Sequence, residues 1–431
     1  MVGSPKSDAR AAAATALQKC PVPHNVRPDQ VLEYDFVHGP EIRADPSACL
    51  DAIREERDAF WSPYYGGFWV FTRYDDIRKA YQNHELLRQN EGVPHVPYGR
   101  KFIPLRLNQP EHIHYRRLMT PIFQPRQIAK LETMIRATAK ERLKEIGPRG
   151  HCEFMSEFAL ALPAAMFCGF VGFPADNFEL FRRLDHDLIY APQEAMRDEG
   201  PEAARAVRAK AQAEIDAIIS ELIVQRKREP GDDAISILLA AEVFDRPLTD
   251  DEVLNIVSLL FFAGTDSTAG AIGFVHGFLA TRPDLKQQII DNVDDDDFIW
   301  KAAEELIRFH GFHHSGRTAT RDGEISGVQI KEGDQVVLST ASANRDERHF
   351  GNSLEVDFNR KNANHHLTFG AGIHRCLGSH LATSQVRIAL QEVHRTIPDY
   401  ELVSPVTYLP GGPKTVPERI DLRYTPVNIG S

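Results

Sequence analysis

The amino-acid sequence predicts a mainly α-helical protein that carries several small β sheets. From residue 110 to about residue 290, apolar side chains recur at helical spacing, with proline or glycine between the runs. β-strand signals occur before this region, at residues 68–72, and again as short runs after Arg308. The 431-residue chain has 42% hydrophobic and 26% charged residues, which is the composition of a globular protein with a large core.

The predicted elements follow one another along the chain. Residues 68–72, Phe-Trp-Val-Phe-Thr, form a short strand, and the residues around Ile77 form an amphipathic helix. Helix then follows helix, which predicts a bundle. After the bundle, short β elements precede a loop around Cys376 and a last helix, and the Pro- and Gly-rich tail at 403–424 predicts a hairpin.

Charge, cysteine content and hydropathy restrict the class of function. The formal net charge of −11 disfavours nucleic acid and anionic membranes as general partners. The five cysteines are scattered without Cys-x-x-Cys spacing, which argues against disulfides and zinc and for a reducing compartment. No apolar run approaches the roughly 20 residues that cross a bilayer, and the N-terminus lacks a signal pattern. We therefore expect a cytoplasmic protein with no membrane partner and a flexible leader at residues 1–20.

Cys376 has the most informative surroundings of any residue in the chain. It lies in residues 369–378, Phe-Gly-Ala-Gly-Ile-His-Arg-Cys-Leu-Gly, where glycines let the backbone adopt positive φ and approach a flat group closely. Backbone N–H groups in such a loop can hydrogen-bond a thiolate. The following apolar pattern places Cys376 just ahead of a helix or on its first turn, and a helix N-terminus lowers the pKa of a thiol. The loop thus predicts a thiolate that faces a ligand.

Residues 369–378 match every fixed position of Phe-Gly-x-Gly-x-His-x-Cys-x-Gly, and they resemble the haem-binding signature of the cytochrome P450 family in its bacterial form. The resemblance implies one mainly helical domain over residues 21–431, built around haem b. It implies that Cys376 is the axial thiolate of the iron, a ligand that favours O–O cleavage in this family. The phenylalanine would lie against the macrocycle and the histidine near a propionate. The implied cofactor-binding residues of the loop are Phe369, Gly370, His374, Cys376 and Gly378.

Other motifs match the family in the same order along the chain. His112 and Arg116 share a helix face at i and i+4, and together with Arg317 they resemble the family's propionate-binding groups. A buried haem dianion requires such cationic partners, and Arg suits bidentate carboxylate recognition. Glu305 and Arg308, at i and i+3, resemble the family's Glu-x-x-Arg element, which implies a structural role under the haem with Asn344-Arg345 or Arg360 as partner.

Residues 259–268 form an apolar helical pattern that small and polar residues interrupt. Gly264 disfavours helix, and the hydroxyl groups compete for backbone carbonyls, a conflict that indicates a site. The segment resembles the family's Ala/Gly-Gly-x-Asp/Glu-Thr motif, in which an acid and an alcohol deliver protons to dioxygen. Asp266 takes the acid position, and Ser267 replaces the usual threonine. Thr268 follows directly, and either hydroxyl could carry the alcohol role.

The tail and the Phe102-Ile103-Pro104 segment resemble most the soluble camphor-type hydroxylases of bacteria. Together with the motifs above, this resemblance implies a haem-thiolate monooxygenase. The implied reaction uses dioxygen to hydroxylate, O-dealkylate or epoxidise a small, mostly apolar substrate such as a terpenoid or small aromatic. Electrons would come from NAD(P)H through an iron–sulfur ferredoxin and its reductase, and we expect a monomer. The local basic patch predicted to receive the ferredoxin consists of Arg116, Arg117, Arg126 and Lys130.

Three alternatives belong to other classes. A peroxide-driven or non-oxidative haem enzyme would not need the Asp266 and Ser267 pair. A haem-binding sensor predicts no ferredoxin-supported consumption of NAD(P)H. A structural protein with an incidental cysteine predicts no thiolate band in the carbon monoxide difference spectrum.

The substrate contacts follow from the resemblance. The camphor hydroxylase carries a tyrosine two residues before Phe-Ile-Pro, where this chain has Arg100, with Tyr98 the nearest tyrosine, and this difference disfavours camphor. Histidines at residues 309–314 replace residues that are apolar or proline in the family, so that one of them meets a polar substrate group or all of them serve the propionates. The predicted substrate contacts are Tyr98, Arg100, Leu259, Phe262, Ala263, Gly264, His313, Thr415 and Val416.

Overall fold

The computed structural model describes residues 19–35, 39, 46–89, 100–173, 178–409 and 416–428. Its helices are α3 (Pro46–Glu56), α4 (Tyr74–Gln82), α5 (Glu111–Met119), α6 (Pro125–Ile146), α7 (Ala161–Val171), α8 (Phe178–Ile189), α9 (Ala191–Asp198), α10 (Pro201–Arg228), α11 (Ala234–Leu239), α12 (Asp250–Gly264), α13 (Asp266–Thr281), α14 (Pro283–Asp291), α15 (Asp296–Phe309), α16 (Thr340–Ala343), α17 (Glu347–Phe350) and α18 (Ser379–Thr396). Shorter helical turns are η1 (Pro28–Gln30), η2 (Thr120–Phe123), η3 (Gly147–Arg149), η4 (Met155–Ala159), η5 (Ala363–His365) and η6 (Gly372–His374). The strands are β1 (Ala59–Ser62), β2 (Phe68–Phe71), β3 (Leu87–Gln89), β4 (His151–Glu153), β5 (Glu242–Val243), β6 (Arg246–Pro247), β7 (His314–Ala319), β8 (Gly323–Ile325), β9 (Val328–Ile330), β10 (Gln335–Ser339), β11 (Glu401–Leu402), β12 (Thr407–Leu409), β13 (Val416–Arg419) and β14 (Asp421–Arg423).

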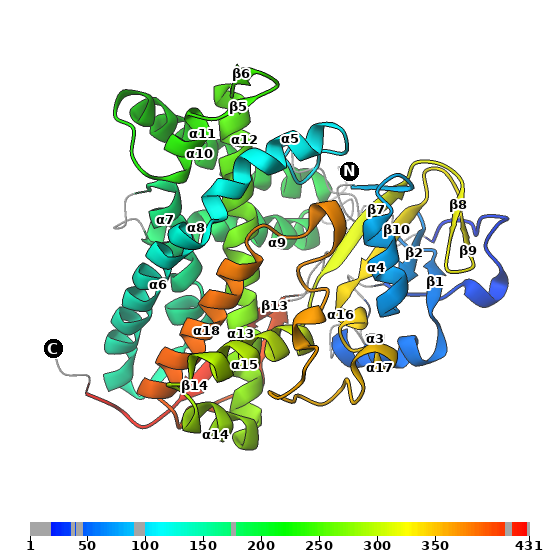
Figure 1. The fold of residues 1–431 in the computed structure, drawn as a ribbon. Helices are drawn as coiled ribbons and strands as arrows, with labels where there is room; N and C mark the ends of the chain where they lie inside the picture. Colours follow the sequence, from blue (N-terminus) through cyan, green and yellow to red (C-terminus); the bar gives the residue numbers. More distant parts are fainter. Residues whose placement is uncertain are drawn as a thin grey trace, which may run out of the picture.

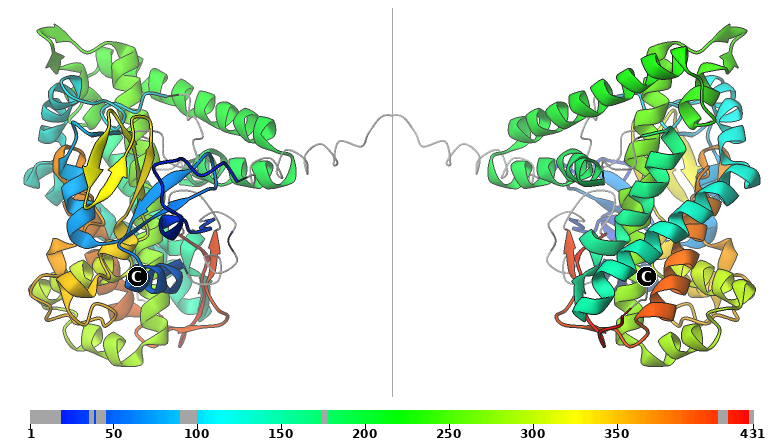
Figure 2. Two further views of the ribbon diagram at one scale, coloured as in Figure 1. Left: turned by 90° about the vertical axis from the view of Figure 1, so that its right-hand side faces the viewer. Right: turned by 90° about the vertical axis from the view of Figure 1, so that its left-hand side faces the viewer.

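A helical region and a β-rich region lie side by side in Figure 1, with α6, α7 and α18 on the left and β1, β2, β7 and β10 on the right. The two side views in Figure 2 agree, because one faces the strands and the opposite one faces α6 and α7. The mainly helical fold with small sheets is therefore as the sequence predicts. The predicted strand at 68–72 is β2, the last helix is α18, and the tail forms the antiparallel β12–β13 hairpin.

The five-stranded sheet has the order β1-β2-β10-β7-β3, in which only β2 and β10 run parallel. Side chains of β2 alternate between two hydrophobic clusters, with Phe68 and Val70 on one face and Trp69 and Phe71 on the other. Both faces are thus covered. Arg317 lies in β7 between its two neighbours, opposite Val336 of β10 and Gln89 of β3, and this pairing fixes its position.

The central helical column consists of α12 followed by α13. A capping box starts it, because the Thr249 hydroxyl accepts from the Glu252 N–H and the Glu252 carboxylate accepts from the Thr249 N–H. The column breaks between Gly264 and Asp266, where Thr265 has φ −90° and ψ −73°. The break coincides with the small and polar residues that the sequence marked as a conflict within a helix.

The segment Asp250–Thr281 is the one described helix that is long and apolar enough to cross a membrane by length and composition, with a mean hydropathy of 1.3. The sequence predicts no membrane-spanning stretch because polar residues interrupt the apolar runs of this segment. Within the fold, 67% of the window that scores highest is buried, and the segment forms the column against which α7, α10, α15 and α18 pack.

Candidate functional site

A cavity of about 470 Å³ lies between the α12–α13 column and the loop that precedes α18. It gathers residues that are up to 305 positions apart in the chain, from Tyr81 to Val386. The residues predicted for the site that line it are His112, Arg116, Leu259, Phe262, Ala263, Gly264, Ser267, Thr268, His313, Arg317, Phe369, Gly370, His374, Cys376 and Gly378.

The loop around Cys376 is held in place by its own backbone. The Cys376 N–H donates to the Phe369 carbonyl at 2.9 Å, which closes the loop. Gly370 and Gly372 have φ of 66° and 68°, the left-handed region that favours glycine. A Cβ at Gly372 would also collide with the carbonyl oxygen of Tyr81. The glycines therefore allow the loop to pack against α4 while the sulfur opens on the cavity.

The surroundings of the Cys376 thiol have opposing effects on its pKa. Burial raises its pKa, whereas the Gly378 N–H and the guanidinium groups of Arg116 and Arg375 favour the thiolate. Because α18 begins at Ser379, Cys376 lies ahead of the helix. A cationic ligand in the cavity would add to the groups that favour the thiolate, so the site suits a thiolate–metal bond.

A cluster of histidine and arginine side chains lies at one end of the cavity. Both ring nitrogens of His112 are buried without a hydrogen-bond partner, and so is Nε2 of His374, whose ring centroid is 4.3 Å away. Burial lowers the pKa of His112 to about 4 and that of His374 to about 3. In the described chain, the guanidinium groups of Arg116 and Arg317 form no ion pair with a carboxylate; they donate to the carbonyls of Arg375 and Gly316. These groups fit a bound dianion.

The Glu305–Arg308 pair is completely buried on α15. Arg308 Nε donates to Glu305 Oε2 and Arg308 Nη2 to Glu305 Oε1, both at 2.8 Å. Arg360 Nε donates to the same carboxylate at 3.0 Å, and Arg308 Nη1 donates to the carbonyl of Asn344 at 2.7 Å. The contacts predicted with Arg360 and with the Asn344 segment are thus both present. The network joins α15 to the segment that leads into the Cys376 loop.

The break between α12 and α13 brings two hydroxyl groups to the cavity wall. Ser267 Oγ donates to the Ala263 carbonyl at 2.6 Å, across the break, while Thr268 is buried and lines the cavity. Asp266 is 2% exposed and does not line the cavity. Burial, followed by the charge of Asp185 on α8, raises its pKa well above the ordinary value. The acid predicted for the relay therefore lies behind the wall that Ser267 forms.

Asp185 is a residue of this region that the sequence did not reveal. It is 1% exposed, and the Thr265 hydroxyl donates to its Oδ1 at 2.7 Å. Asp185 is one of two aspartates in an amphipathic helix and lies 80 residues before Thr265, so no local pattern in the sequence indicates this contact. Two arginines that line the cavity, Arg106 and Arg208, were also missed.

Two predicted substrate contacts in the described part of the chain, Arg100 and Val416, do not line the cavity. Arg100 does not line it, because its guanidinium lies between acids of two helices, at 3.1 Å from Asp216 on α10 and 3.4 Å from Asp251 on α12. Val416 does not line it either, because it packs on Gly270, where an added Cβ would lie 2.8 Å from Val416 Cγ1. Those two predictions are corrected. Tyr98 and Thr415 lie outside the described residues.

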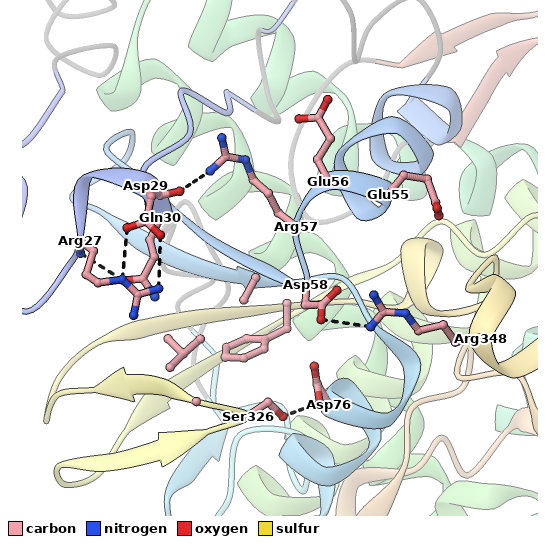
Figure 3. A pocket seen from close by; sticks show the side chains of 14 residues that line it. Arg27, Asp29, Gln30, Glu55, Glu56, Arg57, Asp58, Asp76, Ser326 and Arg348 are labelled. Carbon is pink, nitrogen blue, oxygen red and sulfur yellow. Dashed lines mark hydrogen bonds and ion pairs between the residues drawn. The ribbon is translucent and has the colours of Figure 1, made fainter.

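A second hollow, of about 680 Å³, lies at the β-rich side and is lined by charged side chains (Figure 3). Several of its charged groups are paired with one another. Arg348 Nη1 lies 3.1 Å from Asp58 Oδ2, Arg27 Nε lies 3.1 Å from Asp29 Oδ1, and Arg57 donates to the Asp29 carbonyl. It contains none of the residues predicted for the site.

Comparisons with known proteins agree with the fold. The cytochrome P450 family model matches residues 61–296 and 297–396. Probable cytochrome P450 127A1 of Sinorhizobium fredii is 31% identical over 403 residues, which is 90% of this chain and 94% of that protein. Mycinamicin IV hydroxylase/epoxidase of Micromonospora griseorubida is 30% identical, over 80% of this chain and 86% of its own length. The crystal structure of cytochrome P450 CYP101C1 superposes with a TM-score of 0.84 at 29% identity, covering 94% of this chain and 99% of that one. The chain belongs to the cytochrome P450 family.

The residues of the cavity fit the haem that this family binds. The orphaned nitrogens of His112 and His374 and the unpaired guanidinium groups of Arg116 and Arg317 suit two propionates. Cys376 opens on the same cavity from the loop before α18. These are the groups that would hold the haem.

Removing one propionate partner is expected to weaken haem retention. Arg317→Gln leaves one carboxylate short of a charge-assisted hydrogen bond, worth roughly 1.5–3 kcal/mol, and His112→Leu and Arg116→Gln act in the same way. Haem transfer to an acceptor apoprotein should accelerate by at least about tenfold. Arg321→Gln, four residues further along at an exposed position, is the control. Unchanged transfer rates in all three variants would show that these residues do not bind the propionates.

Proposed function

We propose that the protein is a haem-thiolate monooxygenase that hydroxylates, epoxidises or O-dealkylates a small, mostly apolar substrate. The observation that carries this proposal is the position of Cys376 and of Ser267 with Thr268 on the walls of one cavity. The haem, when bound through Cys376, would supply the activation of dioxygen. Apolar side chains such as Leu259 and Phe262 also line the cavity, and they would bind an apolar substrate and exclude water.

The hydroxyl and carboxyl groups of the α12–α13 break would deliver the protons. The Ser267 hydroxyl is anchored on the Ala263 carbonyl, so its oxygen can accept a hydrogen bond from a water or a protonated acid. Asp266 is the neighbouring acid, and burial beside Asp185 favours its protonated form. A proton held at Asp266 would reach the cavity through Ser267, or through Thr268 if that hydroxyl turns toward the cavity.

A ferredoxin would supply electrons from NAD(P)H at a basic surface near the Cys376 loop. Of the predicted patch, Arg117 and Arg126 are exposed. Arg116 instead turns inward to the Arg375 carbonyl, and Lys130 pairs with Asp232 at 2.6 Å. Arg375 is also exposed, so the surface offered to an acidic partner consists of Arg117, Arg126 and Arg375.

If Asp266 and Ser267 deliver protons in sequence, substitution of each residue should impair turnover in a different way. Asp266→Asn keeps the size of the side chain but removes the acid, and turnover should slow by roughly 100-fold, with haem and substrate binding intact. Ser267→Ala should leave NAD(P)H consumption near wild type but divert it to hydrogen peroxide. Product formed and peroxide released per NAD(P)H, with a ferredoxin pair and a substrate that gives a full spin shift, measure both effects.

The matched variant Thr268→Val tests the neighbouring hydroxyl. If Thr268→Val uncouples while Ser267→Ala does not, the alcohol role belongs to Thr268. If neither variant uncouples, the break does not deliver protons. A protein that forms product from hydrogen peroxide alone, and forms none with NAD(P)H and a ferredoxin pair, would refute the monooxygenase proposal.

A further inference from the structure

Residues 310–314 place three histidines at the cavity, and neighbouring elements hold two of them. The ring of His310 packs between Phe274 and Phe278 of α13, at centroid distances of 5.6 and 4.8 Å, and its Nε2 is fully buried. His314 begins β7, opposite Ser339 of β10, and its Nδ1 is likewise buried. His313 remains.

The imidazole of His313 opens on the cavity without a hydrogen bond. Its backbone is fixed, because its carbonyl accepts from the N–H and the hydroxyl of Thr340 at 3.2 and 2.6 Å. Its ring rests on Phe312 at 4.7 Å. Among the described residues, neither ring nitrogen of His313 has a hydrogen-bond partner, and the residue lines the cavity. Burial lowers the pKa of His313 to about 4, so the ring is neutral and offers one donor and one acceptor.

His313 is separated from the propionate-binding cluster. Alternation places His313, Ser315 and Arg317 on one side of the β7 strand path, and four residues of extended chain span about 13 Å. Ser315 already receives the Tyr81 hydroxyl at 2.7 Å. Before the start of β7, Phe312 stacks on Phe274 of α13, with the ring centroids 5.4 Å apart. His313 therefore lies toward α13, the helix that also carries Ser267, while Arg317 lies toward the cofactor edge.

A neutral, unpaired imidazole in a cavity that fills with cofactor and apolar substrate loses its hydrogen bonds to water. A site with such a group favours a ligand that pairs with it and rejects the analogue that does not. We propose that His313 determines substrate specificity by hydrogen bonding to an uncharged oxygen, a carbonyl or a hydroxyl, on an otherwise apolar substrate. This inference rests on the proposed function, because the ligand occupies the cavity beside the haem.

Three probes of nearly the same shape separate the possible ligand chemistries. They are 1-cyclohexylethanone, which carries a carbonyl, isopropylcyclohexane, which carries none, and cyclohexanecarboxylate, which carries a charge. Binding to the haem-loaded protein is measured by the Soret shift and by calorimetry, without ferredoxin or NAD(P)H. We expect the wild type to bind the ketone at least about tenfold more tightly than the hydrocarbon, equivalent to about 1.4 kcal/mol. Weaker, equal or undetectable binding of the ketone overturns the proposal, and so does tightest binding of the carboxylate, which Arg106 and Arg208 would then explain.

The variants assign the preference to one residue. His313→Leu should abolish the preference for the ketone, and His313→Gln, which keeps a donor and an acceptor, should retain part of it. His314→Leu makes the same change one position later and should leave the preference intact. A preference that survives in His313→Leu, or that His314→Leu removes as well, overturns the proposal. Faster haem loss from His313→Leu also overturns it, because the residue would then serve a propionate. Since no turnover is required, calorimetry reports the preference even if the monooxygenase assays fail.

Discussion

Cys376→Ala is expected to abolish the absorbance band that marks thiolate ligation in the reduced, carbon monoxide-bound protein. Cys376 is the one cysteine of the five that lines the cavity. Cys152 and Cys168 are buried in the large hydrophobic core, where burial raises the pKa of the first to about 12 and of the second to about 11. Neither can therefore take over as a thiolate ligand, and the loss should be complete.

The control for this experiment is Cys168→Ala, which removes a thiol of the core and should leave the band in place. Cys376→Ser keeps the size of the side chain and replaces sulfur by oxygen, so haem can still bind while the thiolate band disappears. A thiolate band that persists in Cys376→Ala would show that another group ligates the iron. That result would also contradict the proposed function, because the cavity contains no second thiol.

The features of the site that depend on neighbouring residues could be predicted from the sequence. The Cys376 loop depends on glycines within six residues, and the Glu305–Arg308 pair depends on helical spacing, so both are visible in a short window. The break at Thr265 is similar, because Gly264 and the following hydroxyl groups disfavour a regular helix.

Contacts between distant segments could not be predicted in the same way. Arg100 is 116 residues from Asp216 in the sequence. The two side chains form an ion pair because the fold packs α10 near Arg100, and Arg100 therefore points to Asp216 and not into the cavity. The position of Val416 depends on the packing of its strand against Gly270, because the absence of a side chain at Gly270 leaves room for Val416. The parallel pairing of β2 with β10 likewise joins segments that no local pattern connects.

The buried Glu305–Arg308 pair gives the second large expected effect. Glu305→Gln removes the charge that pairs with Arg308 and Arg360, and it leaves two guanidinium groups in the interior without a carboxylate. Breaking a buried pair from one side typically costs about 3–5 kcal/mol. The free energy of unfolding, measured by denaturant titration of the haem-loaded protein, should fall by that amount, or the protein should fail to accumulate with haem.

A surface pair on the same helix separates this effect from a general loss of charge. Asp297 pairs with Lys301 at exposed positions of α15, where water already solvates both groups, so Asp297→Asn should leave the denaturation midpoint unchanged. The double variant Glu305→Leu with Arg308→Leu removes both charges of the buried pair but leaves Arg360 without its carboxylate, so it should recover only part of the lost stability. Wild-type stability of Glu305→Gln would mean that water enters this part of the core and solvates the two arginines. The network would then not fix the segment that leads to the Cys376 loop, and haem binding would have to depend on the loop and the propionate partners alone.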